Sequence, residues 1–477
     1  MMKTISVEEK SKNGNGTHMT NGNNLNGLHV KMVTAVPGKN AAPIVAEDSK
    51  YLATSTKCSP VVGELGKGSM IRDVDGNWYV DFTSGIGVTN TGHCHPKVVS
   101  AIINQTSQLM HFAGTDFYYK VQVELAKKLT EITPGKHAKK VFYTNSGAES
   151  VECAIKVAKW HTKRGQFIGF IGAFHGRTMG ANAFMANSIA AIDRYFPMMP
   201  GVTKVPYAYC YRCAYQMEYP SCGCYCAKII DEIYLSKVVP PSETAAFMVE
   251  PVQGEGGYIV PPAEFHQTLK KIAQKHGILY IDDEVQAGFG RTGKMFAIEH
   301  FGIVPDIVLM AKGMGSGMPI GACVFDAKLD FGIEGAHSNT YGGNLVASAA
   351  SLATISVIEE EHLLDNSTRL GKHMKKVLLE LQKKYPVIGD VRGLGLMQII
   401  EFVKDPKTKE PFHKFKDLVV EESYKNGLLL LPCGSGIRLI PPLNIHDDQL
   451  DQGLEILEAA IKNTEGKFGG SYPSKAQ

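Results

Sequence analysis

Short apolar runs alternate with amphipathic segments through the middle of this chain, and that alternation restricts the possible folds more than any other feature. The apolar runs lie at residues 141–144, 246–250, 278–282, 307–311 and 322–325, and segments with helical periodicity lie at 148–161 and 263–276. Runs of four or five apolar residues have the length of buried strands. Strand and helix signals in alternation predict an α/β fold with a mostly parallel central sheet and helices on both faces.

The two ends of the chain have a different pattern from the middle. Asn, Gly, Ser and Thr dominate residues 11–27, which offer almost nothing to bury, so we expect a flexible tail over residues 1–44. After the middle region, long helical patterns precede a few short strands. We therefore predict a large domain at 101–350 and a smaller α/β domain built from both chain ends, at 45–100 and 351–477.

The charge and hydropathy of the chain argue against several classes of function. Fifty Lys and Arg residues against 47 Asp and Glu residues give a formal net charge of +3, which does not fit a dedicated nucleic-acid binder. The apolar runs fall short of the roughly 18 to 20 residues that a membrane helix needs. The N-terminal residues do not resemble a secretory leader, so a cytoplasmic location and free thiols, rather than disulfides, are expected for the ten cysteines.

Residues 288–294, GFGRTGK, match two nucleotide-binding patterns but lack the context of either. A P-loop needs Ser or Thr after the Lys to bind magnesium, and Met295 stands there. A dinucleotide loop follows its strand directly, whereas Asp282, Asp283 and Glu284 come first here. These carboxylates would repel a bound diphosphate.

The same carboxylates suit a ligand that is cationic at this point. An Asp at the end of a buried strand can keep a pyridine nitrogen protonated, as pyridoxal phosphate requires, and either Asp282 or Asp283 could serve. Lys312 directly follows the apolar run 307–311 and is itself followed by glycines. Partial burial there would lower the pKa of its amine toward that of a neutral nucleophile, although a lysine at a strand end is more often a simple surface charge.

Two further segments suit the phosphate and the ring of that cofactor. Residues 144–149, TNSGAE, form a strand end, a turn of small residues and a helix start, where backbone N–H groups bind phosphate. Phe174, in the segment FHGRT, is a candidate for stacking on the pyridine ring, although an isolated Phe more often lies in a core.

The ordered set NSGAES, FHGRT, EPVQGEGGY, DDEVQAGFGRTGK, AKGMGSGMPIGA and TYGGN resembles the class III (omega) aminotransferases, which are fold-type I pyridoxal phosphate enzymes. The resemblance spans residues 50–466. It implies that Lys312 binds the cofactor and shuttles a proton, and that Asp283 rather than Asp282 pairs with the ring nitrogen. It also implies cofactor contacts from Gln286 to the ring hydroxyl, from Phe174 to the ring, from Ser146, Gly147 and Ala148 to the phosphate, and from Thr340 to the phosphate of a partner subunit. A homodimer, or a tetramer, with shared active sites follows from this last contact.

The expected substrate residues resemble those of the 4-aminobutyrate aminotransferase group. Ile86 matches a substrate-gating position, Arg177 matches an arginine for the distal carboxylate, and Glu255 with Arg438 matches a switch pair. A bidentate arginine suits a carboxylate, and pairing with Glu255 would neutralise it when no α-carboxylate is present. The resemblance implies ping-pong transfer of an amino group from an omega-amino acid to 2-oxoglutarate or pyruvate. An ordinary structural ion pair between Glu255 and Arg438 is the alternative.

The Cys-rich segment 207–226 departs from the shared motifs. It resembles a stretch in branches of the family that include amino-acid racemases, so a racemase or epimerase remains the alternative function. Its C-x-x-C and C-x-C-x-C spacings could bind zinc, although a thiol-rich surface or dimer-contact loop is favoured. Residues 93–95, HCH, could also be imagined as metal ligands, but a turn before a helix that begins at Pro96 is favoured. We therefore predict no metal site, and no nucleic-acid or membrane partner.

Overall fold

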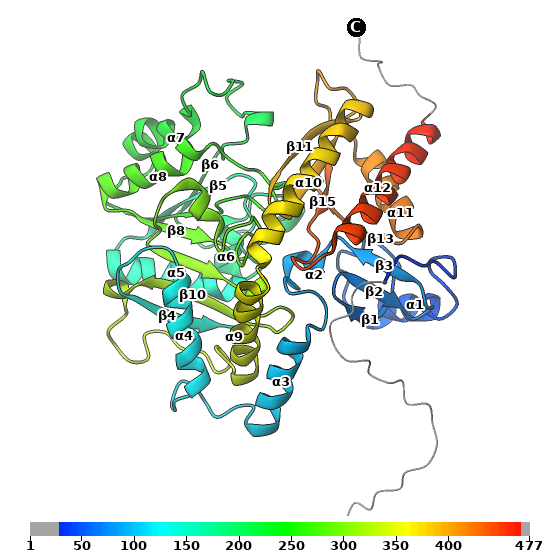
Figure 1. Ribbon diagram of the computed structural model, residues 1–477. Coiled ribbons are helices and arrows are strands. Elements are labelled where there is room, and N and C mark those ends of the chain that lie inside the picture. Colours follow the sequence, from blue (N-terminus) through cyan, green and yellow to red (C-terminus); the bar gives the residue numbers. More distant parts are fainter. Residues whose placement is uncertain (1–27, 469–477) are drawn as a thin grey trace, which may run out of the picture.

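The computed structural model describes residues 28–468, in which strands form one large sheet and two smaller ones (Figure 1). The large sheet has seven strands in the order β4-β10-β9-β8-β7-β5-β6. Only β10 runs antiparallel to its neighbours, so the prediction of a mostly parallel sheet is confirmed. The strands span Lys139–Thr144 (β4), Gln166–Phe170 (β5), Val202–Val205 (β6), Thr244–Val249 (β7), Leu279–Asp283 (β8), Ile307–Met310 (β9) and Gly321–Asp326 (β10).

Both faces of this sheet are buried, as continuous apolar strands require. In β7, Ala246 and Met248 belong to one buried cluster, together with side chains of helix α5 (Gly147–Thr162). Phe247 and Val249 belong to another, together with side chains of helix α8 (Ala263–His276). Since successive side chains of a strand point to opposite faces, α5 and α8 cover opposite faces of the sheet.

The remaining helices lie around the sheets (Figure 1). Among the described residues they span Ala41–Tyr51 (α1), Ser84–Gly87 (α2), Pro96–Gln108 (α3), Lys120–Ile132 (α4), Met179–Phe184 (α6), Tyr225–Ile229 (α7), Leu345–Glu360 (α9), Leu363–Lys384 (α10), His413–Lys425 (α11) and Asp447–Lys467 (α12). A π-helix at Ile230–Val238 continues α7, and 3₁₀ turns lie at Ile189–Ala191, Cys210–Arg212, Ala297–Phe301, Lys312–Met314 and Ala327–Leu329.

The two smaller sheets contain strands from both ends of the chain. One has the order β1-β2-β3-β13 and the other β11-β12-β15-β14. Their strands span Gly63–Lys67 (β1), Met70–Asp73 (β2), Trp78–Asp81 (β3), Ile388–Leu394 (β11), Met397–Phe402 (β12), Leu428–Leu429 (β13), Leu431–Cys433 (β14) and Gly436–Leu439 (β15). Strand β13 pairs with β3 in parallel, with Leu428 opposite Val80. The N-terminal and C-terminal parts thus share a sheet, while the domain boundaries given above stay a prediction.

The chain is packed well before residue 45, where we placed the end of a flexible tail. Residues 1–27 lie outside the described part. From residue 28 onward, however, the backbone of Val30 donates to Gln452 of α12, and Lys31 pairs with Trp78 of β3. Val30 also packs against the core. The Asn- and Gly-rich composition that suggested a tail ends at residue 27, and the apolar side chains after it account for the earlier packing.

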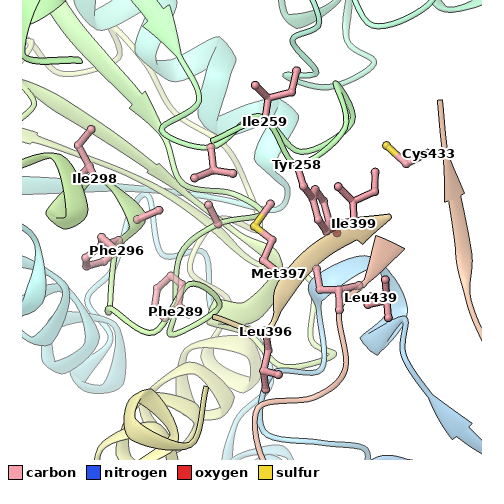
Figure 2. Close-up of a cluster of buried hydrophobic side chains, with 14 of the residues drawn as sticks. Tyr258, Ile259, Phe289, Phe296, Ile298, Leu396, Met397, Ile399, Cys433 and Leu439 are labelled. Atoms are coloured by element: carbon pink, nitrogen blue, oxygen red, sulfur yellow. The ribbon is translucent and has the colours of Figure 1, made fainter. Parts of the chain in front are cut away.

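A single buried cluster joins the C-terminal strands to the loops of the large sheet. Figure 2 shows Leu396, Met397 and Ile399, at and near β12, beside Tyr258 and Phe289 from loops that follow β7 and β8. These loops leave the carboxyl ends of their strands, where open α/β sheets bind ligands. In the described residues, no helix combines the length and apolar character needed to cross a membrane.

Candidate active site

The large sheet brings the predicted lysine and aspartate to the same edge. Asp283 is the last residue of β8, and Lys312 follows the neighbouring strand β9 after one residue. The two strands pair in parallel, with Asp283 opposite Leu309. Ser146, which follows β4, reaches the same region because Thr144 at the end of β4 lies opposite Gly321 at the start of β10.

Lys312 lies in an environment that favours its neutral amine. Burial lowers the pKa of Lys312, while the charges of Glu255 and Asp283 act against this effect and that of Arg438 adds to it. These three predicted site residues are therefore close enough to Lys312 to interact with it electrostatically. The backbone of Lys312 has φ +44°, a left-handed conformation that is rare outside glycine and typical of functional sites.

Asp283 is held by a buried histidine that sequence reasoning missed. Its Oδ2 lies 2.6 Å from Nδ1 of His175, and its Oδ1 accepts a hydrogen bond from the backbone of Val285 at 3.0 Å. Burial lowers the pKa of His175, but the bond and charge of Asp283 outweigh it and raise that pKa. The contact with Nδ1 of His175 therefore orients the carboxylate of Asp283. The position of His175 directly after Phe174, in FHGRT, was the signal that could have identified it.

Asp282 and Glu284, on either side of Asp283, are also fully buried. Burial and nearby carboxylates raise the pKa of Asp282 well above its usual value, and burial raises that of Glu284 to about 8. Glu284 accepts a hydrogen bond from the backbone of Ile298 at 2.7 Å. Neither carboxylate oxygen of Asp282 has a hydrogen-bond partner among the described residues. A neutral Asp282 cannot balance a cationic ring, which favours Asp283.

At the start of α5, small residues form a cradle of the kind predicted for the phosphate. Ser146 is the N-cap, and its hydroxyl accepts a hydrogen bond from the backbone of Glu149 at 3.2 Å. Gly147 and Ala148 open the helix, where N–H groups have no carbonyl partner within the helix. A Cβ at Gly147 would lie 2.7 Å from Cγ1 of Val285, so only glycine fits. This helix N-terminus, lined by small side chains, fits an anionic phosphate.

Phe174 and Arg177 lie together beside this cradle. The guanidinium carbon of Arg177 is 5.4 Å from the centre of the Phe174 ring, and Arg177 is exposed. The backbone N–H of Phe174 donates to buried Glu250 at 3.0 Å, and Glu250 also accepts from the backbone of Gly254 at 2.7 Å. Burial raises the pKa of Glu250 to about 7. Glu250, which sequence reasoning also missed, thus links the Phe174 segment to the loop that carries Glu255.

Glu255 and Arg438 form an ion pair through Oε1 and Nη1. Burial raises the pKa of Glu255, but the charges of Arg438 and Lys312 outweigh it and lower that pKa. Gln286 donates to the same Oε1 at 3.4 Å, and its own Oε1 is buried without a partner among the described residues. The predicted substrate pair and Gln286 are therefore brought together next to Lys312.

Ile86 and Thr340 are exposed, at the edges of this cluster. Ile86 is in the left-handed region at φ +69°, and a Cβ on the adjacent Gly87 would lie 3.0 Å from Ile440 and 3.7 Å from Gln286. Thr340 lies on the turn before α9, and its side chain makes no hydrogen bond within residues 28–468.

The cysteines of the segment 207–226 line one small pocket: Cys210, Cys213, Cys222, Cys224 and Cys226. All are free thiols, and the sulfurs of Cys224 and Cys226 are 3.9 Å apart. No group of three or more His, Cys, Asp or Glu side chains in the described residues is arranged to hold a metal ion.

His93 and His95 pair with different carboxylates. Nε2 of His93 lies 2.7 Å from Asp81, and Nε2 of His95 lies 2.9 Å from Glu361. His95 is the N-cap of α3, which begins at Pro96, so the predicted turn before a helix is confirmed.

Taken together, the lysine, the aspartate, the phosphate cradle and the buried acceptor of Gln286 fit pyridoxal phosphate. The aminotransferase class-III family model matches residues 51–461. A probable 4-aminobutyrate aminotransferase of Bacillus subtilis is 39% identical over 83% of this chain and 92% of its own. An alanine/serine racemase of Pyrococcus horikoshii is 37% identical over 91% of this chain and 93% of its own.

A solved structure has the same fold with the cofactor bound. It is the PLP-bound form of an amine transaminase from an uncultivated Pseudomonas species, with a TM-score of 0.81 and 29% identity. The match covers 87% of this chain and 98% of that one. The family match spans most of the chain, and the site has the residues that the cofactor needs. The chain therefore belongs to the class III aminotransferases, which are pyridoxal phosphate-dependent transaminases.

Proposed function

We propose that this enzyme moves the amino group of an omega-amino acid, 4-aminobutyrate or a near homologue, to 2-oxoglutarate or pyruvate by a ping-pong mechanism. The observation that carries the proposal is the ion pair between Glu255 and Arg438 next to Lys312. An omega-amino acid has no carboxylate beside its amino group, so Arg438 needs Glu255 as a counterion while the donor is bound. The α-carboxylate of the oxo acid would take the place of Glu255 in the second half-reaction.

Lys312 is proposed to act as both the attachment point and the acid–base residue. Bound pyridoxal phosphate supplies an electron sink for negative charge that develops on the substrate carbon bearing the amino group. Nζ of Lys312 would take the proton from that carbon and deliver it to C4′ of the cofactor, which requires the neutral amine that burial favours. Asp283, oriented by His175, holds the proton on the ring nitrogen.

The other predicted residues bind and orient. Ser146, Gly147 and Ala148 bind the phosphate at the start of α5. Phe174 packs on the ring, and Gln286 reaches its hydroxyl. For the substrate, Arg177 is exposed and has no carboxylate partner in the described residues, so it is available for the distal carboxylate. Ile86 narrows the space above the substrate.

A homodimer is part of the proposal, because exposed Tyr341, directly after Thr340, contacts a loop that carries further exposed aromatic side chains. The ring of Tyr341 lies 5.0 Å from that of His111, and the rings of Phe112 and Phe117 lie 4.3 Å apart in the same loop. These aromatic residues are half exposed, and Tyr118 is 98% exposed. A patch of this kind is typical of a subunit interface. Burial of this patch would carry Thr340 to the phosphate of a partner subunit.

The decisive experiment is a donor screen with the purified holoenzyme. Omega-amino acids of increasing length, L-α-amino acids and simple amines are offered with pyruvate or 2-oxoglutarate, and the amino acid product is measured. We expect turnover with 4-aminobutyrate or 5-aminovalerate. Turnover confined to L-α-amino acids or amines without a carboxylate would contradict the proposal.

A racemase or epimerase is the second candidate, favoured by the likeness to the Pyrococcus racemase over 91% of this chain. Such a reaction needs no oxo acid, since the proton removed from the α-carbon returns to its opposite face. L-amino acids incubated with the holoenzyme alone would then yield D-enantiomers. A transaminase leaves the enantiomeric ratio unchanged under these conditions.

A further inference from the structure

Three side chains form one row across the C-terminal sheet, facing the loop that carries Glu255. Arg392 of β11 lies opposite Ile399 of β12, and Ile399 lies opposite Arg438 of β15. Residues directly opposite one another in antiparallel strands point to the same face. The same row therefore contains the arginine of the switch pair and a second arginine, Arg392, to which the proposed reaction assigns no role.

Arg392 also contacts the loop that carries Glu255, at a second position. Its Nε donates to the carbonyl of Gly257 at 2.7 Å. Gly257 has φ +115°, and a Cβ there would lie 2.8 Å from Nη2 of Arg392, so the close approach requires glycine. Ile399 lies between the two arginines and packs beside Tyr258, as Figure 2 shows. The loop is thus held at Gly257 by Arg392 and at Glu255 by Arg438.

Arg392 is itself fixed by carboxylates. Its Nη1 donates to Asp390 at 2.8 Å and to Glu401 at 2.7 Å, and its side chain is only 12% exposed. The planar guanidinium can make these bonds while Nε still reaches Gly257, a geometry that a lysine ammonium cannot reproduce.

The Cys-rich segment supplies the remaining partners of this network. Tyr209 donates its hydroxyl to Glu401 at 2.6 Å, and its ring lies under the guanidinium of Arg392 at 4.9 Å. Nε of Arg212 donates to the other oxygen of Glu401 at 2.7 Å. Glu401, whose side chain is 2% exposed, thus connects the segment to Arg392.

We propose that Arg392, supported by the Cys-rich segment through Glu401, is a positioning residue that holds Glu255 where it neutralises Arg438. The inference rests on the proposed function, because it concerns the state in which no α-carboxylate is bound. If the loop loosens, Glu255 pairs less well with Arg438. A donor without an α-carboxylate then meets an uncompensated cation, whereas a donor with one still finds its partner. The two kinds of donor should therefore respond differently.

The test compares Arg392→Met with the wild-type holoenzyme in single-turnover reactions, followed by cofactor absorbance. The donors are L-glutamate and the best omega-amino acid from the screen. We expect kcat/KM for the omega-amino acid to fall about tenfold, the effect of losing one charge-assisted hydrogen bond, and that for L-glutamate to stay within about twofold. The value of kcat/KM for the omega-amino acid in Arg392→Lys should lie between those of the wild type and Arg392→Met. Arg369→Met, which removes an exposed arginine paired with Asp447, is the matched control and should change neither value.

Equal losses with both donors would leave the ratio of the two kcat/KM values, omega-amino acid to L-glutamate, unchanged. That outcome would show a merely structural role and overturn the inference. If Arg392→Met fails to bind cofactor, Tyr209→Phe decides instead, because it keeps the ring and removes only the hydroxyl that holds Glu401. The same ratio should then fall about two- to threefold, and an unchanged ratio contradicts the inference. A wild-type enzyme that transaminates no omega-amino acid contradicts the proposed function, whatever Arg392 does.

Discussion

Nδ1 of His175 lies 2.6 Å from Oδ2 of Asp283, and the other ring nitrogen of the histidine is buried with no hydrogen-bond partner in the described residues. The imidazole therefore has one strong interaction, and that interaction is with the carboxylate predicted to hold the ring nitrogen of the cofactor. Replacing His175 should weaken the charge that Asp283 presents. We expect His175→Ala to lower kcat by about 10- to 100-fold, the range of a hydrogen bond to a charged group.

The measurement for His175→Ala is steady-state turnover together with cofactor affinity from equilibrium dialysis. Exposed His161 of α5 provides a matched control, and His161→Ala should match the wild type in both. An unchanged kcat in His175→Ala would show that Asp283 needs no support from the imidazole.

Lys312→Ala should lower turnover by about 10³- to 10⁴-fold, because it removes the group that moves the proton. Borohydride treatment of the wild-type holoenzyme should add the reduced cofactor mass to the peptide containing Lys312. Lys294→Ala removes a nearby exposed lysine and should leave turnover unchanged. Full activity in Lys312→Ala, or the label on another lysine, would refute the assignment.

Arg438→Met should discriminate between substrates in the opposite sense to Arg392→Met. Loss of the guanidinium removes the partner of the α-carboxylate and leaves Glu255 to repel it, so kcat/KM for 2-oxoglutarate should fall about 100-fold. The value of kcat/KM for the omega-amino acid donor should fall much less. Adding Glu255→Gln to Arg438→Met removes the repulsion and should restore part of the loss. A uniform loss across all substrates would indicate an ordinary structural ion pair.

Glu284→Gln should stabilise the protein increasingly as the pH rises. Burial raises the pKa of Glu284 in the folded state to about 8, above its ordinary value of 4.5. Below pH 4.5 the carboxyl is protonated in both states and contributes no difference. Between the two pKa values only the unfolded state releases the proton, so the free energy of unfolding decreases as pH rises. In the variant, the side-chain amide still has an oxygen that can accept the hydrogen bond from the backbone of Ile298, and it cannot ionise.

Thermal unfolding at pH 5 and pH 8 measures this effect. The pKa difference corresponds to about 3 to 5 kcal/mol at its full extent, so the gap in melting temperature between variant and wild type should widen toward pH 8. A gap for Glu284→Gln that narrows with pH would show that the carboxyl is ionised in the folded protein.

Local patterns predicted the large sheet and the meeting of Lys312 with the carboxylates after β8, whereas Glu255, Gln286 and Arg438 came from the resemblance to the family. Apolar runs mark β7, β8 and β9, and the residues that follow them necessarily meet at one edge of a parallel sheet. The pairing of His175 with Asp283 depends on how the loop after β5 folds over β8, which no local pattern specifies. The packing of residues 28–44 depends on α12, at the far end of the chain. Arg392 could not be predicted for the same reason, since its role arises from a register across three strands.

The parallel pairing of β3 with β13 has a consequence for how this protein is made. On the ribosome, the strands β1 to β3 emerge first and must wait for Leu428 and Leu429 before β3 gains its outer neighbour. Arg438 is synthesised after all seven strands of the large sheet, and after Lys312 and Asp283. A chain that stops before residue 428 would contain the residues proposed to bind the cofactor but would lack Arg438, the residue proposed to bind the α-carboxylate.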